Sequence, residues 1–321
     1  MKILINAAYG YMGAGAMALF ADRQAADEVT RYGRALLDQV LAALREHGMV
    51  LLEADTDGVY FAAPLGWTEA QERALVAAVA ATLPAGIRLE YEGRYQAMLS
   101  HEVKNYALLT YDGQLIVRGV ALRSSRSEPF GERFLRAALR CTLTGDIAGL
   151  RRAYLETVAA LRERRLPVAE VATQARLSKT PEEYQAARHR LRESPYEALL
   201  AAGRTTWRVG QRIRFYRALD GAAVVLPDTS DDLLGDPGAE ADPTDDPASP
   251  IDARQPHRAD RHDYDVAHYL QVLHASYVGR LRKAFAPEDF DQIFRLDQQL
   301  GLFDRPIAAI QPRWIHCQEH E

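Results

Sequence analysis

The spacing of apolar residues predicts that the first 128 residues form an α+β layer. Apolar side chains recur at helical spacing over 23–46 and again over 68–83. Thr68 is a suitable N-cap for the second of these helices, and Pro84 lies just beyond its end. Short apolar runs predict strands at 49–54, 59–63, 87–91, 95–100, 105–111 and 114–120. Together these elements indicate an antiparallel sheet with helices on one face.

From about residue 129 the pattern becomes mainly helical. One strand-like segment, 205–219, interrupts the helical runs. Apolar residues recur at helical spacing over 130–145, 146–165, 181–191, 195–202 and 263–285. The predicted boundary between the α+β part and the helical part therefore lies near residue 128.

The chain carries a net charge of −5, but its charges are unevenly distributed. Residues 227–253 hold nine acidic residues, five prolines and no basic residue, and without them the net charge is +4. This composition predicts a disordered surface loop over about 227–256. Residues 113–217, in contrast, hold 21 Arg and Lys against 10 Asp and Glu. Such a basic segment fits a nucleic-acid phosphate backbone, and it fits arginine-rich surface helices equally well.

Other features of the composition exclude several classes of protein. No run of eighteen apolar residues is present, which excludes a membrane-spanning helix. The N-terminal sequence MKILINAAYGYMG makes a poor signal peptide. Two cysteines, Cys141 and Cys317, are too few for a disulfide framework or a four-cysteine zinc site. We therefore expect a reduced, cytoplasmic protein.

The sequence Asp55-Thr56-Asp57-Gly58 between two predicted strands is the strongest candidate for chemistry. A tight hairpin there would hold the carboxylates of Asp55 and Asp57 close together at its tip. Such oxygen ligands suit Mg²⁺, which binds one or two protein carboxylates and completes its shell with water and substrate phosphates. An ordinary Asp-Gly turn and the Asp-x-Asp metal site of a sugar-nucleotide transferase are alternatives. A calcium-binding EF-hand loop is excluded, because its twelfth position would be Pro64.

Three motifs, in order along the chain, resemble those of family B DNA polymerases. They are KILINAAYG over 2–10, EADTDGVYF over 53–61 and KNY over 104–106. These are similar to the fingers-helix motif (usually KxxxNSxYG), the palm hairpin motif (usually YGDTDS) and the later KxY motif of that family. Further segments that resemble its thumb are 177–185, 207–216 and 263–273. The resemblance covers essentially the whole chain apart from the acidic insert.

The resemblance implies a partial polymerase palm followed by a mainly helical thumb. Residues 1–12 would end the fingers helix, residues 13–128 would form the palm, and residues 129–321 would form the thumb. The implied activity is template-directed nucleotidyl transfer from a dNTP to a primer 3′-OH by a two-metal mechanism. Asp55 and Asp57 would be the catalytic carboxylates that hold Mg²⁺.

The resemblance also implies contacts to the nucleotide. Lys2 on the fingers helix would neutralise the triphosphate with a compact positive charge. Asn6 and Tyr9, four and seven residues later, would share its helical face. Tyr9 would stack near the nascent base pair, and Gly10 would let the chain approach that pair closely.

Two residues of the third motif are expected to contact DNA. Lys104 and Tyr106 alternate along a predicted strand, so they would share a face. From that face both could contact the primer-template duplex near its growing end.

Some positions depart from the usual family pattern. Glu53-Ala54 replaces the usual Tyr-Gly of the hairpin motif, Gly58 replaces its serine, and Ala7 replaces the serine of the fingers motif. These changes indicate a divergent, bacterial-type branch of the family.

The family's first palm motif, of the form DxxSLYPS, precedes the fingers helix and contributes another metal-binding aspartate. This sequence begins at the fingers helix, so we expect the Mg²⁺ site to need a carboxylate absent from this chain. Alone, the chain should then have little or no polymerase activity. A separately encoded N-terminal polymerase fragment would supply that carboxylate and the exonuclease domain; alternatively, the chain is a truncated product.

The expected partners are primer-template DNA and dNTP, with no membrane, at the nucleoid in the cytoplasm. The pattern leaves a replication role and a repair role equally open. The alternative function is that of a non-catalytic palm–thumb module that binds duplex DNA.

Overall fold

The computed structural model describes residues 2–55, 58–122, 127–227, 261–296 and 305–317. Asp57 and, apart from Pro227, the predicted acidic loop lie outside the described residues. The fold is α+β, as the sequence predicts. Contacts divide the chain into two compact units, unit 1 with residues 1–96, 102–104 and 314–321, and unit 2 with residues 97–101 and 105–313. The predicted palm–thumb boundary near residue 128 rests on the sequence pattern and the family resemblance. The contact-based units do not test it, so it stays a prediction.

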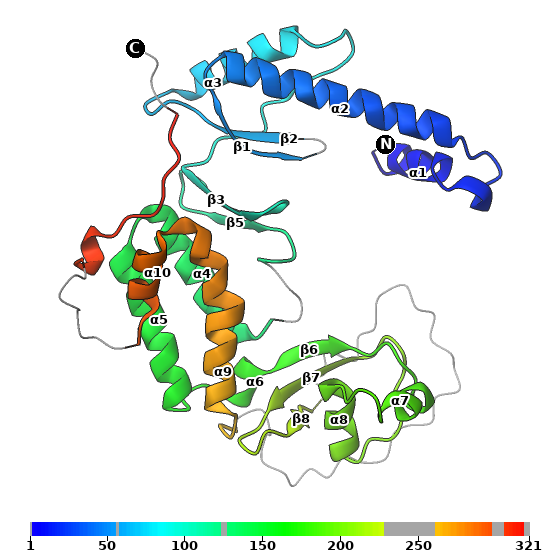
Figure 1. Cartoon of the computed structure of the whole chain (residues 1–321), viewed down its shortest axis with the longest axis vertical. Helices are drawn as coiled ribbons and strands as arrows, with labels where there is room; N and C mark the ends of the chain where they lie inside the picture. The colour runs from blue at the N-terminus through cyan, green and yellow to red at the C-terminus, as the bar shows by residue number, and fades with distance from the viewer. Residues whose placement is uncertain (1, 56–57, 123–126, 228–260, 297–304, 318–321) are drawn as a thin grey trace. The chain divides into compact units, whose positions relative to one another are not determined.

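Unit 1 combines one β-hairpin with long helices (Figure 1). Its elements are α1 (Lys2–Met12), the 3-10 turn η1 (Gly15–Met17), α2 (Arg23–Glu46), β1 (Val50–Asp55), β2 (Gly58–Ala62) and α3 (Glu69–Ala81). The range of α2 is the predicted one, and the helix begins where Asp22 accepts the N–H of Ala25 at 2.9 Å. The predicted N-cap Thr68 forms a capping box with Gln71 at the start of α3.

One face of the β1–β2 hairpin packs on helices α2 and α3. The buried residues there are Val40, Ala43, Leu44, Met49, Leu75, Val79 and Cys317. Val59 and Phe61 of β2 pack against this cluster. Because this face is committed to the core, polar side chains of the hairpin must use the other face.

The strand predicted over 87–91 is wrong. Residues 82–96, all of them described, contain no strand. Side chains hold this segment instead: the hydroxyl of Tyr91 donates to Glu72 on α3 at 2.5 Å, and Arg94 forms an ion pair with the same carboxylate at 3.0 Å. Glu72 is almost fully buried, so these partners satisfy a charge that would otherwise be costly.

Unit 2 contains two three-stranded sheets and most of the helices (Figure 1). The first sheet has the order β3 (Ala97–Glu102), β4 (Asn105–Leu109), β5 (Leu115–Arg118), and the end of β3 belongs to unit 1. The second has the order β6 (Thr173–Arg176), β7 (Arg212–Arg217), β8 (Ala223–Val225). The helices are α4 (Pro129–Thr144), α5 (Ile147–Arg162), α6 (Val168–Val171), α7 (Pro181–Ala187), α8 (Ser194–Ala201), α9 (Val266–Val272), η4 (Leu273–Tyr277), η5 (Val278–Ala284), α10 (Pro287–Phe294) and η6 (Ile307–Ala309).

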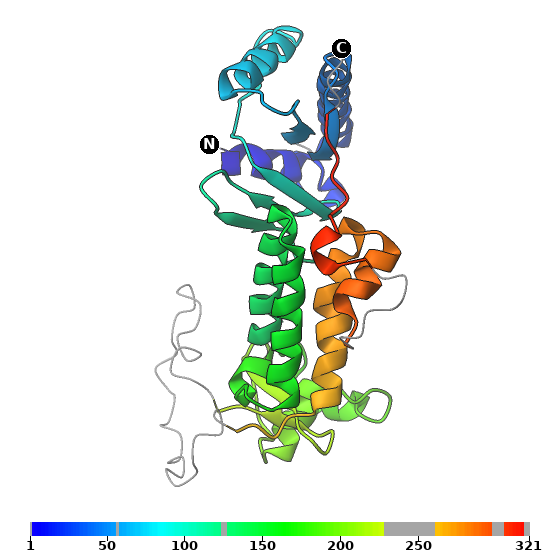
Figure 2. The ribbon, with the colours of Figure 1, turned by 90° about the vertical axis from the view of Figure 1, so that its left-hand side faces the viewer.

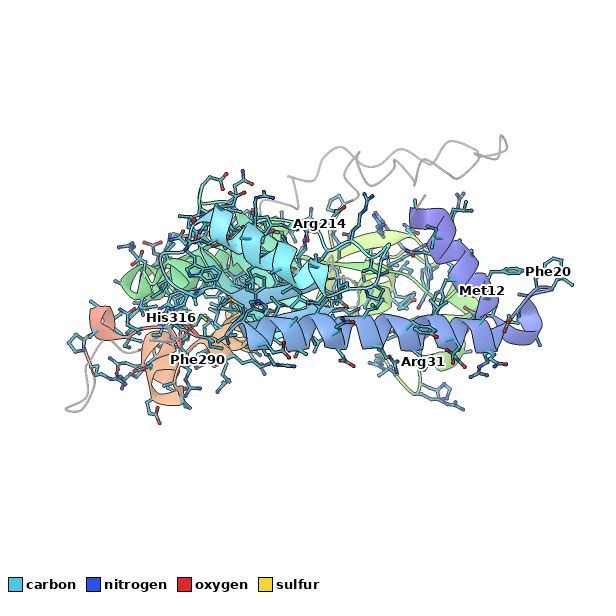
Figure 3. The ribbon with its side chains drawn as sticks, turned by 90° about the horizontal axis from the view of Figure 1, so that it is seen from above. Met12, Phe20, Arg31, Arg214, Phe290 and His316 are labelled. Atoms are coloured by element: carbon cyan, nitrogen blue, oxygen red, sulfur yellow. The ribbon has the colours of Figure 1, made fainter. Side chains whose placement is uncertain are left out.

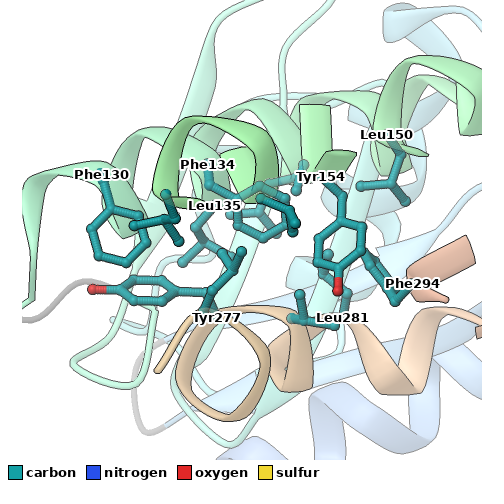
Figure 4. Packing of buried hydrophobic residues seen from close by; sticks show 14 of the residues in the cluster. Phe130, Phe134, Leu135, Leu150, Tyr154, Tyr277, Leu281 and Phe294 are labelled. Atoms are coloured by element: carbon teal, nitrogen blue, oxygen red, sulfur yellow. The ribbon is translucent and has the colours of Figure 1, made fainter. Parts of the chain in front are cut away.

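The main core of unit 2 lies between α4, α5 and the helical segments after residue 265 (Figures 2 and 4). Aromatic rings interlock there: Tyr154 of α5 meets Phe294 of α10 edge-on, with ring centroids 5.2 Å apart. Phe130 of α4 packs against Tyr277 at 6.0 Å. Edge-on and tilted pairs of this kind add to the stabilisation that burial of the rings provides.

A second, smaller core joins two of the segments that resemble a polymerase thumb. Tyr184 and Tyr196 stack with ring centroids 4.4 Å apart, and Trp207 packs on both rings. The indole N–H of Trp207 donates to the carbonyl of Lys179 at 2.9 Å. The third such segment is joined to the second by the hydroxyl of Tyr216, which donates to Asp263 at 2.8 Å.

The helix predicted over 263–285 is not a uniform α-helix. It begins as α9, continues as the π-helical segment η4 and ends as the 3-10 segment η5. The last residue of η4, Tyr277, is buried against α4, where its ring covers Gly131. In the part of the chain that the structure describes, no helix is both long and apolar enough to span a membrane.

Candidate active site

Asp55 is the last residue of β1 and lies on the face of the hairpin that does not pack on the helices. The antiparallel register pairs Asp55 with Gly58 and Glu53 with Tyr60, while Ala54 pairs with Val59. Directly paired residues share a face, so Glu53 and Asp55 lie opposite the core face that carries Val59. Asp57 lies outside the described residues, and its predicted role remains a prediction.

A bulge in β1 allows Leu51 to face the core while Glu53, two residues later, faces the opposite side. Leu51 pairs with Phe61 and Glu53 with Tyr60, so Leu52 is an extra residue between two successive pairs. Strict alternation would place Glu53 on the same face as Leu51. The extra residue shifts the phase, so Leu51 packs toward the core while Glu53 does not.

Lys104 links the two carboxylates of β1. Its Nζ lies 2.9 Å from Oδ1 of Asp55, and its backbone N–H donates to Oε1 of Glu53 with an N–O distance of 2.6 Å. The Lys104 and Asp55 side chains are 62% and 37% exposed. An ion pair this accessible to water adds little to stability. Its main consequence is that it places the Lys104 ammonium group beside the Asp55 carboxylate.

The prediction that Lys104 and Tyr106 alternate along one strand is wrong for Lys104. Lys104 lies in the turn between β3 and β4 and has a positive φ of 64°. Only Tyr106 lies on β4, where it pairs with Arg118 of β5 and is half-buried. Lys104 belongs to unit 1 and Tyr106 to unit 2. The sequence Glu102-Val103-Lys104-Asn105 contains no Gly or Pro that would signal this turn.

The predicted nucleotide-binding residues all lie on α1. Asn6 and Tyr9 are three residues apart on this helix, so they share one face, whereas the side chain of Lys2 lies outside the described part of the structure. Asn6 is exposed, and the hydroxyl of Tyr9 forms a hydrogen bond of 2.7 Å with Oγ1 of Thr30 on α2. A methyl group added at Gly10 would meet nothing within 4 Å. Within the described chain, Gly10 therefore serves no close internal contact.

The residues of the hairpin fit a magnesium ion chemically. Asp55 already draws an ammonium group to its carboxylate, so a cation is favoured at this position. In the described ranges no three His, Cys, Asp or Glu residues gather as a metal site. Mg²⁺ commonly takes only one or two ligands from protein carboxylates, and Asp55 can provide one of them.

Glu53 is the residue of this site that sequence reasoning missed. Its position in the hairpin motif usually carries tyrosine, which marked it as a departure from the pattern. Its spacing from Asp55 could have indicated a place in the site, because residues two apart on a strand share a face. The contact with Lys104, 51 residues later, has no local signal.

The comparisons with known proteins define the family. The sequence matches the family described as DNA polymerase family B over residues 1–285. The chain therefore belongs to DNA polymerase family B, as the three motifs indicated.

Related sequences bear the name DNA polymerase. The DNA polymerase of Thermococcus sp. (strain 9oN-7) is 27% identical over 313 residues, which cover 94% of this chain and 36% of that polymerase. DNA polymerase 1 of Pyrococcus abyssi (strain GE5 / Orsay) is 37% identical over 125 residues, 38% of this chain and 16% of that protein. The bacterial-type branch stays a prediction.

A solved structure shares the fold. The family B DNA polymerase from the hyperthermophilic archaeon Pyrobaculum calidifontis superposes with a TM-score of 0.56 at 18% identity. The match covers 94% of this chain and 33% of that polymerase. This chain thus spans about a third of the length of the polymerases that it matches from end to end.

Proposed function

We propose that this chain forms the palm hairpin and thumb of a DNA-directed DNA polymerase, which transfers a nucleotide from a dNTP to a primer 3′-OH. The observation that carries the proposal is the family match over residues 1–285 combined with Asp55 at the end of a strand whose other face packs, through Leu51, against the hydrophobic cluster of unit 1. In-line attack of an alcohol on a phosphate needs carboxylates that hold divalent cations beside the reacting oxygens. A rigid hairpin backed by a core is a suitable support for such a group.

Asp55 and Asp57 are the proposed metal ligands. Bound Mg²⁺ would supply charge stabilisation to the attacking and leaving oxygens. The chain itself supplies the carboxylates, and Lys104 neutralises Asp55 in their present arrangement. A further carboxylate from the upstream part of a polymerase would complete the set.

The exposed face of α1 and the loop after it fit the proposed partner, the upstream part of a polymerase. Large apolar side chains that are more than 70% exposed there are Ile3, Leu4, Met17, Leu19 and Phe20. Figure 3 shows Met12 and Phe20 at the end of α1 and the turn that leads into α2. Exposed apolar surface of this extent marks an interaction site. We propose that a separate N-terminal fragment, or preceding residues of the same polypeptide, covers it.

Primer extension tests the proposal. The chain is mixed with a polypeptide that carries the DxxSLYPS segment, and extension of a primer is measured with Mg²⁺ and dNTP. We expect extension only when both are present, and a loss of at least a hundredfold in Asp55→Asn and Asp57→Asn, because a metal ligand is removed. Glu46→Gln, an exposed carboxylate at the end of α2, should leave the rate unchanged. Full extension by both aspartate variants would exclude the metal role.

A second candidate, a non-catalytic module that binds duplex DNA, is favoured by one surface of unit 2. Arg188, Arg190 and Arg192 surround a shallow hollow together with Gln185 and His189. Arg188 is bound to Glu197, whereas Arg190 and Arg192 are exposed and form no ion pair with the rest of the described chain. Binding of this kind would be salt-dependent and indifferent to Asp55 and Asp57.

A further inference from the structure

Lys104 holds a backbone conformation that is unfavourable for its residue type. Its φ of 64° lies in the left-handed region, where the Cβ atom of an L-residue is crowded. Among the described residues other than glycine, only Arg164 shares a positive φ. Asn and Asp tolerate this region through local hydrogen bonds of their side chains, and lysine has no such option. The turn therefore needs support from elsewhere in the fold.

The carboxylate of Glu53 provides a contact of the right kind. Its Oε1 accepts the Lys104 N–H at 2.6 Å, so an acceptor oxygen on β1 holds the backbone of the turn. The strand β1 fixes Glu53 itself, because Glu53 pairs with Tyr60 directly after the bulge. A residue of a paired strand thus holds the backbone N–H of Lys104.

The same lysine reaches Asp55 with its ammonium group, at 2.9 Å. The direction in which a side chain leaves the backbone depends on the backbone dihedrals. A turn with a different φ at residue 104 would send the Lys104 side chain elsewhere. Glu53 and Asp55 therefore hold opposite ends of one residue.

We propose that Glu53 is a positioning residue, which fixes the left-handed turn at Lys104 and thereby places the Lys104 ammonium on Asp55. The inference rests on the proposed function only in treating Asp55 as a ligand of the catalytic ion. It assigns a role to a carboxylate at a position where the hairpin motif usually has tyrosine. The essential property of Glu53 is an acceptor oxygen at this place, and its negative charge is secondary.

The variants Glu53→Gln and Glu53→Ala separate these properties in the full chain. Glutamine keeps an acceptor oxygen and loses the charge, whereas alanine loses both. Two readouts are measured by mass spectrometry: hydrogen exchange of the Lys104 amide and acetylation of its Nζ by an activated acetate ester. The chain has four lysines, so Lys179 and Lys283 serve as internal references. Glu46→Ala is the matched control.

We expect Glu53→Ala to raise both rates at residue 104 about fivefold, the effect of losing one hydrogen bond of ordinary strength. Glu53→Gln should stay within about twofold of the parent, and the reference lysines should not change. Equal increases in both variants would mean that charge matters and would overturn the proposal. Unchanged rates in Glu53→Ala would also overturn it.

Asp55→Asn keeps the test decisive if Glu53→Ala fails to fold. This variant loses the ion pair and retains the contact between Glu53 and Lys104, so acetylation should rise while amide exchange stays slow. If both rates rise, the two ends of Lys104 do not act as proposed. None of these rates depends on polymerase activity, so a failure of the proposed function leaves their interpretation intact.

Discussion

The ring of Tyr277 occupies the space that a side chain at Gly131 would need. A Cβ atom at position 131 would lie 2.0 Å from Cζ of Tyr277 (the two segments face each other in Figure 4). The hydroxyl at the far end of that ring donates to the Glu128 carboxylate at 2.7 Å and accepts the Glu128 N–H at 2.9 Å. Burial raises the pKa of Tyr277, so the phenol stays protonated and can keep donating. The start of α4 is thus fixed by a residue 149 positions later in the chain.

Gly131→Ala should destabilise unit 2 by about 1 to 3 kcal/mol, because the ring cannot shift without losing its hydrogen bonds. Chemical denaturation followed by far-UV circular dichroism measures this change. Gly33→Ala is the matched control: Gly33 lies within α2 with nothing within 4 Å, so alanine should stabilise that helix by up to about 1 kcal/mol. Equal effects of the two substitutions would contradict the packing argument.

Acid should weaken the small aromatic core of unit 2 through Glu197. Hydrogen bonds from Arg188 and Tyr184 lower the pKa of Glu197 from 4.5 to about 2. A carboxyl with a lowered folded-state pKa stabilises fully above its unfolded pKa and loses that contribution as the pH falls toward the folded value. The parent should therefore lose stability between about pH 4.5 and 2, and Glu197→Gln should be less stable at pH 7 by about 1 kcal/mol with a flatter acid profile. Thermal unfolding across that pH range checks both.

Removal of the N-cap of α3 should lower the stability of the protein moderately. Thr68→Ala deletes the side chain that accepts the Gln71 N–H, which should lower stability by about 1 kcal/mol. Thr68→Ser retains the acceptor oxygen and should keep most of the stability of the parent protein. Denaturant midpoints of the three proteins make the comparison, and identical midpoints for alanine and serine would count against the cap.

The exposed arginines Arg190 and Arg192, in the segment after α7, give a test of DNA binding. Arg190→Ala with Arg192→Ala should weaken binding to any duplex sequence and reduce the dependence of affinity on salt by up to about two released ions. Fluorescence anisotropy at several salt concentrations measures the slope. Arg31→Ala, whose side chain pairs with Glu28 on α2, is the control and should not change it.

The helices with strong local signals were predictable, and the contacts that complete the site were not. α2 has an amphipathic pattern and an Asp22 cap, so its predicted and observed bounds agree. β6 and β8 are short strands that form only by pairing with β7, and no local pattern announces them. The strand expected over 87–91 failed because Tyr91 is held by Glu72, a side-chain contact that alternation does not encode.

Some parts of the candidate site were likewise predictable from the sequence and others were not. The sequence predicted the hairpin and the place of Asp55, since both follow from apolar strands around an Asp-Gly turn. It placed Lys104 on a strand and gave Glu53 no role. Both errors concern one contact between β1 and the β3–β4 turn, which depends on the folded chain.

The bulge at Leu52 makes the residues of β1 unequal in their tolerance of deletion. Loss of Leu52 would remove the extra residue and leave the pairs Leu51 with Phe61 and Glu53 with Tyr60 in phase, so both faces of the hairpin would keep their side chains. Loss of Ala54 would bring Asp55 opposite Val59 and move its carboxylate to the other face of the hairpin, away from the Glu53 side. Of these two residues of β1, only the one that the ladder already leaves out can therefore be lost without moving Asp55 to the other face.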